Sequence, residues 1–331
     1  MILVTGGAGY IGSHVVLKLL ENKFPVVIFD NLSTGHLETV ETLKQYGRID
    51  FIKGDLLNKD DLKQVFKQFK IDAVIHFAAF SQVGESVKDP EKYYVNNVVG
   101  TINLLSAMLE NSIKKVVFSS TAAIYGEPDY TPIDEEHPQK PVNPYGKTKL
   151  MIEQIMDDYD NAYDLKSVRL RYFNVAGADE KTRIGEWHDS ETHLIPNILK
   201  STLEQVKTFQ LFGDDYNTKD GTCVRDYINV EDLAQAHILA LSYLLDGGRT
   251  TFFNLGTQEG NTVKEVFECC EKVVGKKIKK EILPRRDGDP EILIAANKKV
   301  KDILGWKPQK TLKDCVHTAY LWEQKLNKDL Q

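Results

Sequence analysis

Residues 5–12 read TGGAGYIG, and this stretch decides the fold. The apolar residues 2–5 before it are typical of a buried strand of a parallel sheet. Residues 12–22 after it carry apolar side chains at helical spacing. Glycines at such a turn permit a tight bend, let a pyrophosphate approach the backbone and let the helix pack closely on the strand. The loop therefore predicts a dinucleotide site at the N-terminus of the first helix.

The next apolar stretch, residues 25–30, predicts a second strand that ends at Asp30. A carboxylate about 20 residues beyond the glycine loop can accept hydrogen bonds from the adenosine ribose hydroxyls. It would repel a 2′-phosphate, and the following residues 31–35, NLSTG, contain no arginine. The pattern therefore favours NAD over NADP.

The alternation of strands and helices continues along the chain. Strands are expected at 49–53, at 72–79 and within 114–126, with helices at 59–69 and 91–111. Continuously apolar strands in this alternation predict an α/β fold, a Rossmann-type doubly wound parallel sheet with a smaller α/β substrate domain.

The regular alternation of strands and helices ends after residue 177, where loops rich in Gly, Asp and Thr separate shorter elements. We expect an NAD-binding Rossmann domain over 1–177 and a second domain over 178–331 that binds the substrate. Parts of 225–257 contain apolar stretches that we expect to return to the first domain.

Residues 143–149, NPYGKTK, place Tyr145 and Lys149 four positions apart, on one face of a helix for which Pro144 suits the start. A free phenol has a pKa of about 10 and is a poor base at neutral pH. The Lys149 ammonium and an oxidised nicotinamide would both lower that pKa, so we expect Tyr145 to act as the acid/base. An exposed helix start with a solvated lysine is the common alternative for this spacing taken alone.

Composition excludes several other classes of function. The formal net charge of −6 disfavours nucleic acid or an anionic membrane as partner. The four cysteines show no CxxC spacing, which indicates reduced thiols in a cytoplasmic protein. The eight histidines show neither HExxH nor a Cys/His cluster, so no metal site is predicted. The N-terminal residues do not resemble a signal peptide, and no run of 18 apolar residues occurs.

With these features together, the chain resembles the extended short-chain dehydrogenase/reductase family. The resemblance extends from Met1 to about Leu326. The similar segments are GDL (54–56), HFAA (76–79), NNVVGT (96–101), SSTAAIYG (119–126), NPYGKTK, RYFNVAGA (171–178), DGTCVRDYINVEDLA (220–234) and RRDGDP (285–290). The last four are most similar to members that epimerise UDP-sugars at C4.

The resemblance implies an activity and its partners. It implies an NAD-dependent isomerase that interconverts UDP-galactose and UDP-glucose through a 4-keto intermediate. NAD would be tightly bound and regenerated in each cycle, and the second domain would bind the UDP-sugar. It also implies a homodimer. The apolar stripes of helices 91–111 and 146–159 fit such an interface, and fit packing within one chain equally well.

The roles of the family's residues carry over by position. Tyr145 would be the acid/base, Lys149 its partner and a ligand of the nicotinamide ribose, and Thr121 the hydroxyl that bonds the sugar. The implied cofactor site comprises Gly6, Gly9, Tyr10, Ile11, Gly12, Asp30, Asn31, Leu32, Ser33, Thr34, Gly35, Asp55, Leu56, Phe77, Ala78, Ala79, Ser81, Asn96, Ser119, Tyr145, Lys149 and Phe173. The implied substrate site comprises Thr121, Tyr145, Asn174, Leu194, Phe212, Arg225, Arg286 and Asp289.

Two departures from the family pattern bear on specificity. Ser81 stands where some epimerases carry a lysine that helps to hold NAD. Leu293 stands near the position at which some members carry a tyrosine that limits the size of the sugar. Because leucine is smaller, 4-epimerisation of UDP-GlcNAc and UDP-GalNAc, or of UDP-glucuronate, is an alternative activity. Related 4,6-dehydratases place Asp-Glu directly after the threonine, where this chain has Ala122-Ala123. A remote alternative is a non-catalytic regulator that senses the dinucleotide.

Overall fold

The computed structural model describes residues 1–203, 208–285 and 290–329. A seven-stranded sheet with the order β10-β6-β5-β4-β1-β2-β3 forms its centre, and all its neighbouring strands pair in parallel. The predicted Rossmann-type sheet is therefore confirmed. Its strands are β1 (Ile2–Thr5), β2 (Val26–Asp30), β3 (Ile49–Lys53), β4 (Ala73–His76), β5 (Lys115–Thr121), β6 (Lys166–Tyr172) and β10 (Thr251–Leu255).

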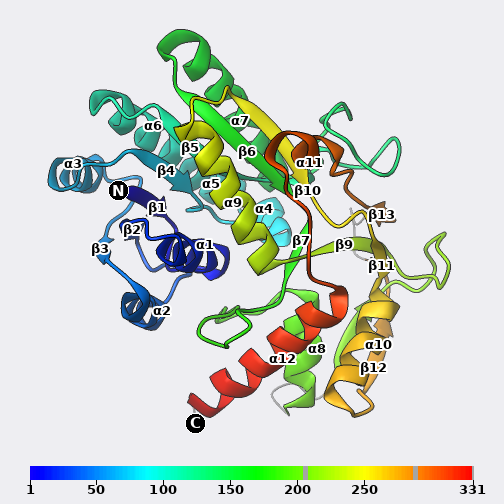
Figure 1. Ribbon diagram of the computed structural model, residues 1–331. Coiled ribbons are helices and arrows are strands. Elements are labelled where there is room, and N and C mark those ends of the chain that lie inside the picture. Colours follow the sequence, from blue (N-terminus) through cyan, green and yellow to red (C-terminus); the bar gives the residue numbers. More distant parts are fainter. Residues whose placement is uncertain (204–207, 286–289, 330–331) are drawn as a thin grey trace.

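Helices cover both faces of this sheet (Figure 1). Successive strand residues point to opposite faces, so Ile2 and Val4 join one apolar cluster and Leu3 joins the other. The first cluster includes α1 (Tyr10–Glu21), α2 (Leu37–Leu43), α9 (Val230–Leu245) and α11 (Lys298–Leu304). The second includes α3 (Lys59–Gln68), α6 (Gly100–Glu110) and α7 (Pro144–Tyr163).

The long helix expected over 91–111 is interrupted by a π-helical segment. It consists of α5 (Pro90–Tyr93), the π segment Tyr94–Val99 and α6. Within the π segment, Asn97 accepts a hydrogen bond from Phe80 N at 2.9 Å and donates one to Phe80 O at 3.0 Å. The wider turn thus lets one buried amide fix the loop between β4 and α4 (Val83–Lys88).

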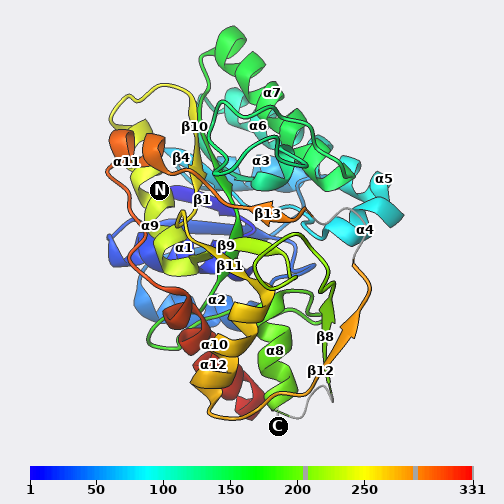
Figure 2. The same ribbon diagram turned by 90° about the vertical axis from the view of Figure 1, so that its right-hand side faces the viewer.

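A smaller α/β part lies beside the carboxyl ends of the large sheet (Figure 2). Strand β9 (Val224–Asn229) pairs in parallel with β7 (Asn174–Ala176) and β13 (Ile292–Leu293), and antiparallel with β11 (Gly260–Thr262). Strands β8 (Phe209–Phe212) and β12 (Lys280–Leu283) form a second small sheet. A third apolar cluster joins these strands to α8 (Leu194–Thr202), α10 (Val263–Val274) and α12 (Leu312–Asp329).

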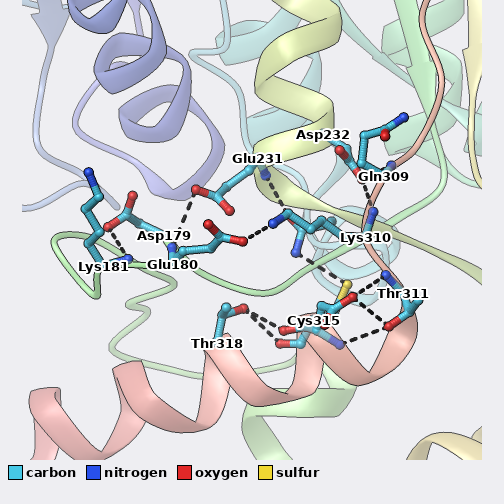
Figure 3. A network of polar contacts seen from close by, with 12 residues as sticks. Asp179, Glu180, Lys181, Glu231, Asp232, Gln309, Lys310, Thr311, Cys315 and Thr318 are labelled. Atoms are coloured by element: carbon cyan, nitrogen blue, oxygen red, sulfur yellow. Dashed lines mark hydrogen bonds and ion pairs between the residues drawn. The ribbon is translucent and has the colours of Figure 1, made fainter.

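The chain crosses between the two parts more than once, because α9 and β10 pack with the large sheet although β9, just before them, belongs to the smaller part. A network of hydrogen bonds joins α9 to the segment before α12 (Figure 3). The Asp232 carboxylate on α9 accepts hydrogen bonds from Gln309 N at 2.8 Å and Lys310 N at 2.9 Å. Ala178 N donates to the Thr318 hydroxyl on α12 at 3.1 Å. Over the described ranges, no helix is both long and apolar enough to cross a membrane.

Candidate active site

A cavity of about 1180 Å³ runs along the carboxyl ends of the large sheet and reaches the smaller part. Most residues predicted for the two sites line this one cavity. They are Gly6, Gly9, Tyr10, Ile11, Gly12, Asp30, Asn31, Ser33, Thr34, Asp55, Leu56, Phe77, Ala78, Ala79, Ser81, Asn96, Ser119, Thr121, Tyr145, Lys149, Phe173, Asn174, Leu194, Phe212 and Arg225. The open edge of a doubly wound sheet is where such folds bind ligands.

Four predicted residues are not among the described lining of the cavity. Leu32 packs against the apolar cluster under α1. Gly35 lies so close to Ala8 that a Cβ there would stand 2.8 Å from Ala8 C, so its role is to let two backbone segments approach. Arg286 and Asp289 lie outside the described residues.

The glycine loop presents bare backbone to the cavity. Gly9 is the N-cap of α1 and has no side chain to cover the helix N-terminus. A Cβ built on Gly9 would meet only Gly6 O, at 3.5 Å, whereas one on Gly12 would stand 2.1 Å from that oxygen. Gly12 therefore permits close packing of turn and helix, and Gly9 leaves the N–H groups of the first turn open to an anion. This geometry fits a dinucleotide pyrophosphate.

Asp30 ends β2 beside this loop and is 7% exposed. Its Oδ2 accepts a hydrogen bond from Ala8 N at 3.0 Å, and its Oδ1 accepts one from Leu32 N at 2.8 Å. Each carboxylate oxygen keeps a second lone pair, which leaves acceptors for ribose hydroxyls. Asp30 thus holds the glycine loop in place as well as facing the cavity, a role that the sequence did not indicate.

Tyr145 and Lys149 lie one turn apart at the start of α7. The Asn143 side chain caps this helix by accepting a hydrogen bond from Gly146 N at 2.8 Å, and Pro144 occupies its first position. A Cβ on Gly146 would stand 2.5 Å from Ala123 O, so only glycine lets α7 pack this closely on the turn after β5. That packing brings the Tyr145 phenol to the Thr121 hydroxyl, with which it forms a hydrogen bond.

Burial dominates the electrostatics of this pair. Burial raises the pKa of Tyr145 to about 12, and the hydrogen bond from Thr121 opposes that rise only in part. Burial also lowers the pKa of Lys149 to about 7, so the ammonium holds its proton weakly at neutral pH. Lys149 Nζ donates to Ser119 O at 2.8 Å and lies 5.9 Å from the centre of the Tyr145 ring. Desolvation is therefore the largest influence on the phenol, and the lowering of its pKa by Lys149 and an oxidised nicotinamide together stays a prediction.

Sequence reasoning missed Glu153, one further turn along α7. Glu153 is 2% exposed and pairs with Arg171, whose Nε donates to Glu153 Oε1 at 3.0 Å. Arg171 is 1% exposed and also donates to the Tyr125 hydroxyl at 2.9 Å. The negative charge of Glu153 raises the pKa of Lys149 against the effect of burial. The spacing 145, 149, 153 was the available signal, since all three share one helix face.

The far end of the cavity is lined by the smaller part. Arg225 on β9 is 8% exposed, and its Nη1 donates to Val224 O at 2.9 Å and to Pro290 O at 2.7 Å. Asn174 begins β7, Leu194 begins α8 and Phe212 ends β8. One guanidinium, one amide and two apolar side chains thus face the same space, which suits a phosphate joined to a flat base.

Comparisons with known proteins identify the family. The family described as GDP-mannose 4,6 dehydratase matches residues 3–319. The chain is 52% identical over 324 residues to a UDP-glucose 4-epimerase of Halalkalibacterium halodurans, covering 98% of this chain and 95% of the relative. The chain belongs to the extended short-chain dehydrogenase/reductase family.

Solved structures of this family superpose on the chain over almost its whole length. A UDP-glucose 4-epimerase of Stenotrophomonas maltophila, with bound NAD and formylated UDP-arabinopyranose, has a TM-score of 0.96 and 39% identity, and 99% of each chain is covered. A UDP-Glc/GlcNAc 4-epimerase of Campylobacter jejuni has a TM-score of 0.86 and 41% identity, covering 98% of this chain and 99% of that one. The extended short-chain dehydrogenase/reductase fold therefore accounts for both parts of the molecule.

Proposed function

We propose that this protein is an NAD-dependent UDP-glucose 4-epimerase that interconverts UDP-galactose and UDP-glucose. The observation that carries the proposal is one continuous cavity. It has the glycine loop at one end and Arg225 at the other, with Tyr145 and Thr121 between them. Relatives of about this length and fold are UDP-glucose 4-epimerases, and related structures hold NAD, in one of them together with a UDP-sugar.

In the proposed cycle the chain's residues move one proton and hold two ligands. Bound NAD⁺ supplies the hydride acceptor for C4 and the positive charge that favours the phenolate. The ionised Tyr145 oxygen accepts the proton of the sugar's 4-hydroxyl as hydride leaves C4, and Thr121 holds that hydroxyl in line. Arg225 retains the diphosphate while the 4-keto sugar rotates to present its opposite face. The phenol then returns its proton as hydride returns to the opposite face, so no cofactor is consumed.

The Tyr145→Phe variant tests this assignment. We expect a loss of turnover of roughly 10² to 10⁴, the usual contribution of a general acid/base. Binding of UDP-glucose, measured calorimetrically, should stay within a few-fold of wild type because only the proton acceptor is removed. Tyr159→Phe, on the same helix but outside the cavity lining, is the matched control. Near-normal turnover in Tyr145→Phe would refute the role.

A second substrate class is favoured by Leu293, which lines the cavity on β13 beside Arg225. A leucine there leaves space for an N-acetyl group, and the Campylobacter jejuni relative is a UDP-Glc/GlcNAc 4-epimerase. We therefore propose that UDP-GalNAc and UDP-GlcNAc are also accepted, and Leu293→Tyr should lose this activity selectively. Dehydration is disfavoured because Ala122 and Ala123 line the cavity and cannot transfer protons.

We also propose a cytoplasmic homodimer. Val95 and Val99 on the π segment and Met151 on α7 are at least 40% exposed, on helical segments that pack beside one another. Apolar side chains grouped in this way favour contact with a second copy. No disulfide joins the four cysteines, all of which lie in the described part of the chain, and this suits a reducing compartment.

A further inference from the structure

A cluster of ligand-type side chains lies in the segment before α8, at the edge of the cavity. The 186–193 cluster comprises Glu186, His188, Glu191 and His193. One ligand atom from each residue lies within 4.8 Å of all the others. Three of these residues, His188, Glu191 and His193, also line the cavity. The segment reads EWHDSETH, and the spacing of its histidines and glutamates matches neither an HExxH motif nor a Cys/His cluster.

The histidines and carboxylates converge on one point. His188 Nδ1 lies 3.4 Å from Glu186 Oε1 and 3.4 Å from Glu191 Oε2. His193 Nδ1 contacts Glu186 Oε1 as well and lies 4.0 Å from Glu191 Oε1. In a tetrahedral zinc site with bonds of about 2.0–2.2 Å, ligand atoms stand about 3.3–3.6 Å apart. Both rings therefore present Nδ1 to the same two carboxylates, and the two His188 distances match the tetrahedral spacing.

A second observation points to a missing partner. The Glu191 side chain is 4% exposed. Its Oε1 accepts hydrogen bonds from Thr192 N and His193 N, both at 2.8 Å, but its Oε2 has no hydrogen-bond partner among the described residues. A buried carboxylate oxygen without a partner is costly, so a group that approaches it would be stabilised.

The carboxylates around this point also favour a bound cation. Glu186 and Glu323 are buried, and both lie close to Glu191. Lys200 Nζ offers one positive charge, 3.9 Å from Glu191 Oε2. When both histidines are neutral, as metal ligands are, Glu186 and Glu191 face the Lys200 ammonium alone, and a divalent ion would offset the remaining negative charge.

We propose that the 186–193 cluster binds a divalent transition metal ion, with Zn²⁺ as the best match. Two imidazole nitrogens and two carboxylate oxygens suit Zn²⁺, whereas Mg²⁺ prefers six oxygens in an octahedron. Four protein ligands leave no open position, so the ion is structural. It fixes the segment that leads into α8, whose first residues, Leu194 and Ile195, line the cavity.

The test is direct binding of the metal and does not use catalytic activity. Untagged protein is treated with a chelator, exchanged into metal-free buffer and titrated calorimetrically with ZnCl₂, and bound zinc is then measured by mass spectrometry after gel filtration. Wild type should retain one Zn²⁺ per chain, and millimolar Mg²⁺ should not displace it. The double variant His188→Ala/His193→Ala should bind at least about 100-fold more weakly, since even an outer-shell partner is typically worth 10- to 100-fold.

Two further variants keep the result interpretable. Glu191→Gln preserves the size of the side chain and removes a charged ligand, so it should fold as wild type by circular dichroism yet bind zinc at least about 10-fold more weakly. His317→Ala removes an exposed histidine of α12 outside the cluster and should bind zinc as wild type does. No retained zinc in wild type, displacement by Mg²⁺, or equal affinity in wild type and the double variant would overturn the proposal.

Discussion

Single residues set the proton chemistry of the cavity wall. Burial raises the pKa of Tyr145 to about 12, so the chain's own groups keep the phenol protonated at neutral pH. Lys149, with its pKa lowered to about 7 by the same burial, cannot reverse this. We expect the charge that favours phenolate to come from a ligand, which would couple the base to the presence of the oxidised cofactor. An enzyme arranged in this way has its strong base only when a hydride acceptor is bound.

The ionisation of Tyr145 should therefore depend on NAD⁺. Without cofactor, we expect no titration of this phenol between pH 6 and 9.5, because a group with a pKa of about 12 stays protonated there. With NAD⁺ bound, one ionisation should enter that window. The measurement is the phenolate absorbance of wild type minus that of Tyr145→Phe, with and without NAD⁺. A phenol that ionises below pH 8 in cofactor-free protein would contradict the argument.

Helix α7 is the element that joins catalysis to the core. One face carries Tyr145, Lys149 and Glu153, so the cavity wall and a fully buried ion pair belong to the same rigid unit. Arg171 on β6 anchors that unit to the sheet through Glu153. Truncating one partner of such a pair leaves an uncompensated buried charge, whereas removing both can be nearly neutral.

Glu153→Gln should accordingly destabilise the protein by about 3–5 kcal/mol, measured by urea denaturation. The double variant Glu153→Gln/Arg171→Met should recover most of that loss. As a control, Glu41→Gln breaks the exposed pair with Lys44 and should cost at most about 1 kcal/mol. If the single and double variants at the buried pair were equally unstable, the pair would act through shape and not through charge.

Helix α9 carries a buried histidine that makes stability depend on pH. His237 is 0% exposed, and burial lowers its pKa from 6.5 to about 4. As the pH falls from 6.5 towards 4, the unfolded chain takes up a proton that the folded chain does not, so the folded state loses stability. This loss is absent above pH 6.5, where both states are neutral.

The variant His237→Leu removes that loss. Between pH 7.5 and 5.0, its free energy of unfolding should rise relative to wild type by about 2 kcal/mol. Urea denaturation at the two pH values measures the difference, and His317→Leu, at an exposed site, should show no such change. A wild type and a His237→Leu variant with equal pH dependence would show that the histidine is already charged in the folded state.

At the scale of the whole molecule, the sequence predicted those features that short segments encode. The glycine loop, Asp30 and the Tyr145–Lys149 spacing each follow from local pattern, and the large sheet follows from alternating apolar strands. The pairing of Glu153 with Arg171 and the pKa of Tyr145 depend on contacts between separate segments and on burial, and the convergence of the 186–193 cluster depends on the conformation of its loop. A single sequence does not contain these distances, so they had to come from the structure.

The proposed dimer is also a property of the whole molecule. We expect wild type to elute as a dimer at micromolar concentration by gel filtration with light scattering. Val99→Glu/Met151→Glu should elute as a monomer, because charges would be placed in the apolar contact. Ile303→Glu, on an exposed apolar residue of α11, should remain dimeric. A monomeric wild type would refute this interface.

The wall of the cavity runs in the chain from Gly6 to Leu293. During synthesis, the pocket cannot close until almost the entire polypeptide has left the ribosome. A product truncated before β13 would still contain the glycine loop, Tyr145 and Arg225, yet it would lack Leu293 and the strand that pairs with β9 beside Arg225. Nonsense mutations late in the gene should therefore abolish activity as completely as early ones, even where a Rossmann half accumulates in the cell.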